Sequence, residues 1–149
     1  MAQIKYKNRR EYLDFYGSAI AERLGPQIQR LSPDLLIPVP VHPSRRRARG
    51  FNQAEELARR LSERLGIPMS ADLLFRIRKT SPQKSLTPAE RLQNLEHAFS
   101  SRPLPKEARR ILLVDDIYTT GATMEACARA LKKNGAQEVY FVTIFIGAS

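Results

Sequence analysis

The sequence predicts an α/β fold with a mainly parallel central sheet flanked by helices. Short apolar runs that resemble strands alternate with segments of helical period, and glycine or proline separates many of them. The last apolar run is also rich in aromatic and β-branched residues, as strands are. Parallel strands joined by helices bring their loops together at the carboxyl ends of the strands, so we expect a ligand to bind at that edge.

Composition indicates one folded domain over residues 1–149. Of the 149 residues, 42% are hydrophobic and 27% are charged, which is enough for one core and leaves no room for a second domain. The single cysteine, Cys127, excludes an internal disulfide or a zinc site built on paired cysteines, and it favours a reducing, cytoplasmic setting. The longest apolar run, residues 139–148, is too short for membrane insertion.

The formal net charge of +10 favours an anionic partner. Phosphorylated ligands, nucleic acid and anionic membrane surfaces all fit such a charge, and composition does not choose among them.

The first half of the chain predicts two helices around a short strand. Residues 8–24 place apolar side chains at helical spacing, and we expect Gly25-Pro26 to end this helix. Residues 35–41 form an apolar run whose two prolines make its far end an extended loop. An arginine-rich loop closed by Gly50 follows, and residues 53–65 form a second helix before Gly66.

The segment from 69 to 107 has weaker patterns. Residues 69–77 resemble a strand, and residues 79–88 form a polar, proline-containing loop. Thr87 or Pro88 can begin a short helix that runs to Leu95. A short strand at 98–99 and a polar linker over 100–107 complete this part.

The last third predicts a strand, a helix and a strand. Residues 111–114 form a compact strand that ends in two carboxylates, and residues 123–134 form a helix that Gly135 caps. Residues 138–146 form the final strand.

Residues 111–126, ILLVDDIYTTGATMEA, carry the clearest chemistry. In the turn between strand and helix, backbone N–H groups and threonine hydroxyls can converge on an anion, and the helix dipole adds positive charge. Gly121 allows a positive φ or a close approach of a phosphate. The residues of this expected phosphate cradle are Thr119, Thr120, Gly121, Ala122 and Thr123.

Asp115 and Asp116 stand just before the cradle. Ionised carboxylates accept hydrogen bonds and would repel a bare phosphate, so they suit ribose hydroxyls or a hydrated cation. The two features together predict a ribose 5-phosphate site. An ordinary strand-to-helix turn is the alternative. The glycine-rich motifs G-x-x-x-x-G-K-[ST] and G-x-G-x-x-G are absent, which disfavours nucleoside triphosphate hydrolysis.

The segment LLVDDIYTTGAT resembles the 5-phosphoribosyl-1-pyrophosphate (PRPP) signature of type I phosphoribosyltransferases. The whole chain is similar to the ComF/GntX group of competence-associated phosphoribosyltransferase-like proteins. That resemblance rests on the signature, on IPVPVHPSRRRARGFNQAEELA (37–58), on TSPQKSLTPAERLQN (80–94) with AF at 98–99, and more loosely on IKYKNRRE (4–11). Many members begin with a four-cysteine, zinc-ribbon-like segment, which this sequence lacks.

The resemblance implies roles for three groups of residues. Asp115 and Asp116 contact the ribose and are the catalytic candidates, and the cradle holds the 5-phosphate. The diphosphate loop consists of Val41, His42, Ser44, Arg45, Arg46 and Arg47, where guanidinium groups suit phosphate oxygens. A solvated basic loop, or one that contacts a nucleic-acid backbone, is the alternative there. Lys79, Gln83, Lys84 and Arg91 belong to a flexible loop that closes over PRPP, or to an exposed linker.

The same resemblance implies a type I phosphoribosyltransferase-like fold. Residues 1–30 form a helical, hood-like segment and residues 31–149 a PRPP-binding core. Mg²⁺ is held mainly by PRPP oxygens, with Asp115 and Asp116 able to assist through water.

Two functions remain open at this point. In one, the protein transfers a 5-phosphoribosyl group to an unknown acceptor and releases diphosphate, in association with competence and DNA uptake. In the other, it is a non-enzymatic accessory protein of natural transformation that senses PRPP or binds single-stranded DNA, with competence proteins as partners.

Several other residues have a structural and a functional interpretation. His97 is expected to be a bystander, and Cys127 a small buried apolar residue rather than a nucleophile. Tyr12, Phe15 and Tyr16 form either a stacking surface for bases or part of the core.

Overall fold

The computed structural model describes residues 9–41, 53–77, 87–90, 93, 97–118 and 121–146. The elements are α1 (Arg9–Leu31), β1 (Leu35–Pro38), α3 (Gln53–Leu65), β2 (Leu74–Arg76), β3 (Phe99–Ser101), β4 (Arg110–Tyr118), α5 (Ala122–Lys133) and β5 (Glu138–Ile146).

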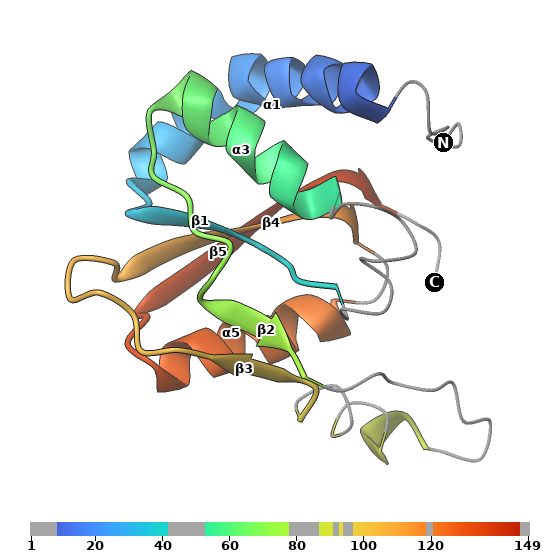
Figure 1. Ribbon diagram of the computed structural model, residues 1–149, viewed down its shortest axis with the longest axis vertical. Coiled ribbons are helices and arrows are strands. Elements are labelled where there is room, and N and C mark those ends of the chain that lie inside the picture. Colours follow the sequence, from blue (N-terminus) through green and yellow to red (C-terminus); the bar gives the residue numbers. More distant parts are fainter. Residues whose placement is uncertain are drawn as a thin grey trace.

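A three-stranded parallel sheet in the order β1-β4-β5 forms the centre of the fold (Figure 1). Leu35 of β1 pairs with Ile111 of β4, and Pro38 pairs with Val114. On the other side of β1, Met69 forms an isolated parallel bridge with Leu36. A separate antiparallel hairpin consists of β2 and β3. The α/β fold with a mainly parallel sheet is therefore confirmed.

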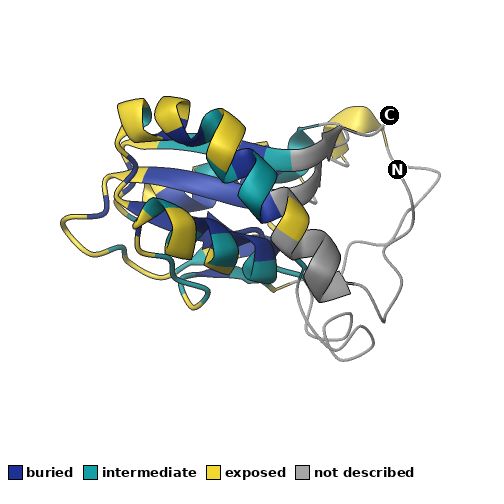
Figure 2. Cartoon of the chain, turned by 90° about the horizontal axis from the view of Figure 1, so that it is seen from above, coloured by how far each residue is buried: buried dark blue, intermediate teal, exposed yellow. Residues whose placement is uncertain are grey.

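Alternation along the strands divides the core between the two faces of the sheet. On one face, Leu36 and Leu112 pack with Leu57 and Leu61 of α3 and with Ile20 of α1. On the other face, the strands pack against α5 and the hairpin. The members of that second cluster include Ile37, Ile111, Leu113, Phe99, Cys127 and Leu131. Figure 2 shows the buried residues concentrated in the strands between the two helical layers.

Helix α1 is longer than the sequence predicts, because it continues through Gly25 and Pro26 to Leu31. The expected stop at Gly25-Pro26 is therefore wrong. Gly25 is buried against α3, where a Cβ would meet Leu65 at 3.4 Å, and Ile28 extends the buried stripe at 4% exposure. Packing against α3 outweighs the local cost of a proline inside a helix.

Strand β4 is also longer than predicted, since the expected strand ends at residue 114 and the observed one reaches Tyr118. Asp115 and Asp116 therefore lie within a strand rather than beyond its end. The reason is that β5 continues beside β4 after β1 has ended at Pro38.

Most other element boundaries agree with the sequence predictions. The helix over 53–65 and the strand over 138–146 are confirmed, and α5 begins one residue earlier than expected. Residues 69–77 contain only the Met69 bridge and β2, and β3 includes Ser100 and Ser101 of the expected linker. Pro88–Glu90 are helical, with the Glu90 N–H donating to Thr87 Oγ1 at 3.2 Å. The expected end of that helix lies outside the described residues.

The described part of the expected hood-like segment is α1, which packs on α3 as the outer layer of that side (Figure 1). Among the described helices, none combines the length and hydrophobicity needed to cross a lipid bilayer.

Asp34 joins the starts of two neighbouring strands. Its N–H donates to the Arg110 carbonyl at 2.7 Å, and its Oδ2 accepts from the N–H groups of Arg109 (3.0 Å) and Arg110 (2.8 Å). We expect Asp34→Ala to lower the free energy of unfolding by about 1 kcal/mol, because water replaces a charged acceptor at two backbone donors. Urea unfolding measures this change.

Asp72→Ala is the matched control, since Asp72 is an exposed carboxylate in the turn before β2. We expect it to cost less than about 0.5 kcal/mol. An equal loss in both variants would contradict the role assigned to Asp34.

Candidate functional site

The carboxyl end of β1 lies beside the middle of β4, which continues past it to Tyr118. Pro38 is paired with Val114, and the Val39 N–H donates to the Val114 carbonyl at 2.9 Å. The chain therefore leaves β1 towards the half-buried Val41 beside the point where β4 reaches Asp115. The beginning of the expected diphosphate loop and the first of the two candidate carboxylates share the edge of the sheet where β1 ends.

Asp115 is half-buried at that edge and pairs in register with Thr143 of β5. Alternation places it on the face of Ile111 and Leu113, which is the face that α5 covers. Asp116 belongs to the same strand, and its side chain lies outside the described residues.

Helix α5 begins at Ala122, and Gly121 is its N-cap residue. Gly121 has φ 80° and ψ −10°, a left-handed conformation that favours glycine. Gly121 makes no side-chain cap hydrogen bond, and the N-terminal end of α5 carries the positive end of the helix dipole. Ala122 and Thr123 follow in the first turn, both half-buried. The positive φ of Gly121 and the start of a helix after it are the two described features of the expected cradle.

Cys127 lies on the buried side of α5, and charged residues of two strands affect the pKa of its thiol. Its thiol is 0% exposed, as the sequence prediction of a buried apolar role requires. Burial raises the pKa of the Cys127 thiol far above its ordinary value of 9.0. The negative charge of Asp115 raises this pKa further, and the positive charge of Arg76 opposes the rise. Both charged groups are thus within electrostatic reach of the same thiol.

Arg76 is a candidate site residue that the sequence pattern did not reveal. It ends β2, is half-buried, and has its guanidinium carbon 5.5 Å from the centre of the Phe99 ring. The hairpin packs on the α5 face and so brings this cation to the side of the sheet where Asp115 lies. The available signal was a basic residue at the end of a strand-like run, just before the expected flexible loop.

The hairpin also holds the two ends of the segment that contains the expected flexible loop. The Ile77 N–H donates to the Ala98 carbonyl at 2.7 Å, which extends the pairing of β2 and β3 by one step. Ile77 and Ala98, which stand on either side of the expected flexible loop in the sequence, therefore lie side by side.

Several expected site residues lie outside the described part of the structure. They are His42, Ser44, Arg45, Arg46, Arg47, Lys79, Gln83, Lys84, Arg91, Thr119 and Thr120. Their roles remain predictions.

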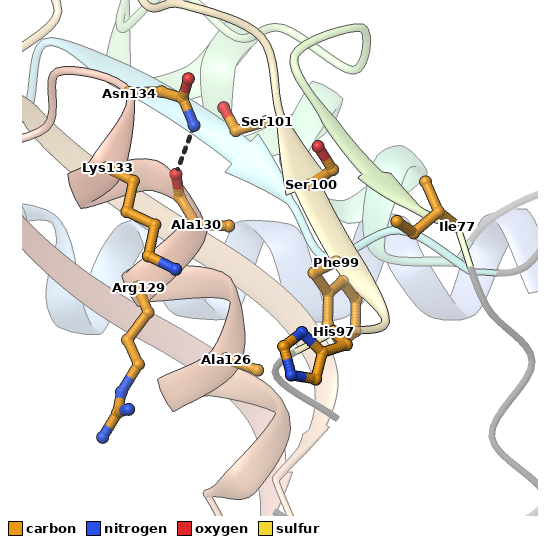
Figure 3. A pocket seen from close by; sticks show the side chains of 10 residues that line it. All are labelled: Ile77, His97, Phe99, Ser100, Ser101, Ala126, Arg129, Ala130, Lys133 and Asn134. Atoms are coloured by element: carbon orange, nitrogen blue, oxygen red, sulfur yellow. Dashed lines mark hydrogen bonds between the residues drawn. The ribbon is translucent and has the colours of Figure 1, made fainter. Parts of the chain in front are cut away.

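A pocket of about 340 Å³ lies between the hairpin and the C-terminal half of α5 (Figure 3). Its floor is apolar, with Phe99 and Ala126 both buried, and none of the described residues that line it is a carboxylate. The polar residues that line it are His97, Ser100, Ser101, Arg129, Lys133 and Asn134. Its positive rim would favour an anion over a cation.

The described residues contain no group of three histidine, cysteine or acidic side chains that could hold a metal ion. Within that part of the chain, Asp115 is the only one of the two expected site carboxylates whose side chain is placed. This donor set fits a cation that takes most of its ligands from a bound molecule.

Phe15 is 68% exposed, so it does not belong to the core of the chain. The core interpretation of this aromatic residue is therefore wrong, whereas the side chains of Tyr12 and Tyr16 lie outside the described residues.

Residues 47–149 match the family model of the phosphoribosyl transferase domain. Competence protein F of Haemophilus influenzae is 39% identical over 109 residues, which are 72% of this chain and 48% of that protein. Competence protein ComFC of Bacillus subtilis is 31% identical over 138 residues, which are 91% of this chain and 53% of that protein. The chain thus spans about half the length of the curated relatives it matches.

Among solved structures, the purine phosphoribosyltransferase from Pyrococcus horikoshii Ot3 is similar with a TM-score of 0.54 and 24% identity. The similarity covers 89% of this chain and 71% of that one. At this level of identity it shows a shared fold.

The buried thiol predicts a pH dependence of stability. The folded pKa of Cys127 is raised, so the folded state keeps a proton that the unfolded state loses above about pH 9. Stability from this group is fully present below the unfolded pKa and is lost as the pH rises above it, by up to about 1.4 kcal/mol per pH unit.

Urea unfolding of the wild type and of Cys127→Ala between pH 8 and pH 10 tests this. The difference between their free energies of unfolding should shrink as the pH rises, because only the wild type loses stability through this thiol. A constant difference would show that the thiol titrates alike in both states.

Proposed function

The chain belongs to the phosphoribosyl transferase domain family, and from this premise we propose that it binds PRPP at the carboxyl edge of its parallel sheet. Its fold is type I phosphoribosyltransferase-like, as the sequence predicts. The observation that carries the proposal is the shared edge, where β1 ends beside Asp115 and a glycine with positive φ is the N-cap of α5.

The N-terminal turn of α5 is the proposed 5-phosphate site. Gly121, Ala122 and Thr123 present backbone N–H groups at the positive end of the helix dipole, and Thr119 and Thr120 precede them in the sequence. A Cβ at position 121 would be strained at φ 80° and would stand on the side that a phosphate must approach.

Asp115 is the proposed partner of the ribose hydroxyls, together with Asp116. A half-buried carboxylate one strand position beyond Val114 accepts hydrogen bonds from hydroxyl groups and keeps the phosphate on the neighbouring turn by repulsion. Arg76 stands on the same side and offsets part of the negative charge when no ligand is bound.

The loop after β1 is the proposed diphosphate site, through Val41, His42, Ser44 and the arginines at 45–47. Since β1 ends beside β4, this loop starts next to the ribose position. Mg²⁺ would be held mainly by diphosphate and ribose oxygens, with Asp115 and Asp116 able to assist through water. When bound, it would neutralise charge on the leaving diphosphate.

The reaction that this arrangement supports is transfer of the 5-phosphoribosyl group. The bond between C1 and the diphosphate oxygen breaks, the diphosphate keeps the electron pair, and an acceptor forms the new bond to C1. The carboxylates offset the positive charge that develops on the ribose, and the cradle fixes the orientation of the sugar. Lys79, Gln83, Lys84 and Arg91 would exclude water from this charge-separated state.

A role in competence and DNA uptake is part of this proposal, and two relatives whose names include competence support it. Because the chain spans about half of each relative, this role is proposed for the matched domain only.

A second function, binding of single-stranded DNA by an accessory protein that senses PRPP, is favoured by one further observation. The pocket beside α5 combines an apolar floor with Lys133 and with Arg129, whose guanidinium also pairs with Glu125 at 2.9 Å. Such a surface attracts a phosphate backbone, and the +10 net charge of the chain acts in the same direction.

Calorimetric titration with PRPP tests the first proposal. We expect selective binding that requires Mg²⁺, with weaker binding of ribose 5-phosphate and none of ATP. Gly121→Val should weaken PRPP binding about a hundredfold or more, since losing the phosphate contacts costs roughly 3 kcal/mol. Asp115→Asn combined with Asp116→Asn should also weaken binding while the fold is kept.

Gly66→Val is the matched control for the backbone effect. Gly66 has φ +70°, similar to Gly121, but it follows α3, and a Cβ added there would meet no atom within 4 Å. The control should lower thermal stability by a similar amount and leave PRPP affinity unchanged. Normal binding by Gly121→Val would show that the phosphate lies elsewhere.

The second function predicts binding of single-stranded DNA that falls steeply with salt and has little sequence preference. Fluorescence anisotropy with a labelled oligonucleotide measures this. If the pocket takes part, Lys133→Glu should lower the affinity for DNA. The control, Glu63→Lys, changes the net charge by the same amount in the opposite direction on α3, and it should raise the affinity by less. No binding at low salt would remove this function.

A further inference from the structure

Strand β5 forms an open edge of the sheet. It lies beside β4 at the end of the order β1-β4-β5, and no strand pairs with its outer side within the described part of the chain. The strand has nine residues, and after Glu138 it contains neither charge nor proline. Proteins usually protect such an edge with a charge, a proline or a covering element, because it is a template for pairing with another chain.

The same edge carries an exposed aromatic side chain next to a hollow. Phe141 is 53% exposed, and the hollow beside it, of about 210 Å³, lies between β5 and α5. Its lining is mainly apolar, from Leu113, Met124, Ala128 and Val139, with Glu125 on the α5 side. An exposed large apolar group beside an apolar hollow is typical of an interaction surface.

We propose that this surface binds a second copy of the chain, through antiparallel pairing of the two β5 strands about a twofold axis. In a register centred on Phe141, the two Phe141 rings lie opposite each other and cover the two hollows. The central sheets then continue across the interface as one sheet of six strands, two sets of β1-β4-β5.

The charges around the hollow are complementary under this symmetry. On α5, Glu125, Ala128 and Lys132 lie three or four residues apart and so share a face of the helix. Within its own helix, Glu125 forms an ion pair with Arg129 at 2.9 Å. A twofold axis makes the two α5 helices antiparallel, so that Glu125 of one copy also lies towards Lys132 of the other. The two Glu138 side chains fall at opposite ends of the paired strands and do not repel each other.

This inference does not rest on PRPP binding. The hollow borders the proposed 5-phosphate turn through Gly121, which lines it, but the pairing needs no ligand. The oligomeric state of the ligand-free chain therefore tests it separately.

Sedimentation velocity of the chain at micromolar concentration should give a species of twice 17.0 kDa. Phe141→Asp should raise the dissociation constant at least about tenfold, because it places a charge at the centre of the interface. Phe15→Asp is the matched control, since Phe15 is more exposed, at 68%, but lies on α1. It should leave the dimer intact.

A charge exchange provides a second test that does not alter the strand. Glu125→Lys and Lys132→Glu should each weaken the dimer, and the double variant should restore it. Far-ultraviolet circular dichroism checks that each variant is folded. If Phe141→Asp does not fold, the charge-exchange variants test whether the dimer forms through this surface. A monomeric wild type, or a dimer that none of these changes weakens, would overturn the proposal.

Discussion

Parallel pairing of β4 with β1 on one side and β5 on the other is the interaction that organises the whole fold. It brings the ends of two strands that are distant in sequence to one edge, so that Val39 and Asp115 lie beside each other. It also fixes which residues of β4 face α3 and which face α5. A shift of register by one residue would exchange these faces and move Asp115 to the opposite side of the sheet.

The buried face under α5 connects the candidate site to the hairpin. Cys127 lies between β4 and β2, where its thiol responds to Asp115 and Arg76 with opposite signs. Asp115 of β4 and Arg76 of β2 therefore act on one buried thiol from two separate elements. The hairpin therefore brings a positive charge to the α5 face of the sheet and pairs Ile77 with Ala98, on either side of the expected flexible loop.

Family membership supports a ligand-binding role for this domain, whereas the exposed edge of β5 supports pairing with a second copy. The family match covers residues 47–149, which include β4, α5 and β5. The proposal for the β5 edge comes from physical argument alone, since a nine-residue strand with no charge after Glu138 and with an exposed Phe141 is a surface that proteins rarely leave uncovered. The two regions meet at Gly121, so assembly and ligand binding would involve neighbouring parts of one turn.

Features that depend on nearby residues could be predicted from the amino-acid pattern alone. The helix over 53–65, the strand over 138–146, the turn at Gly121 and the burial of Cys127 are of this kind, and so are the positions of the carboxylates and the cradle along the chain. Tertiary contacts, in turn, set the passage of α1 through Pro26, the extension of β4 to Tyr118, the approach of Arg76 and the exposure of Phe15 and Phe141. Each of these depends on how segments far apart in the chain pack, and the free energy of such packing exceeds the local preferences that a sequence pattern records.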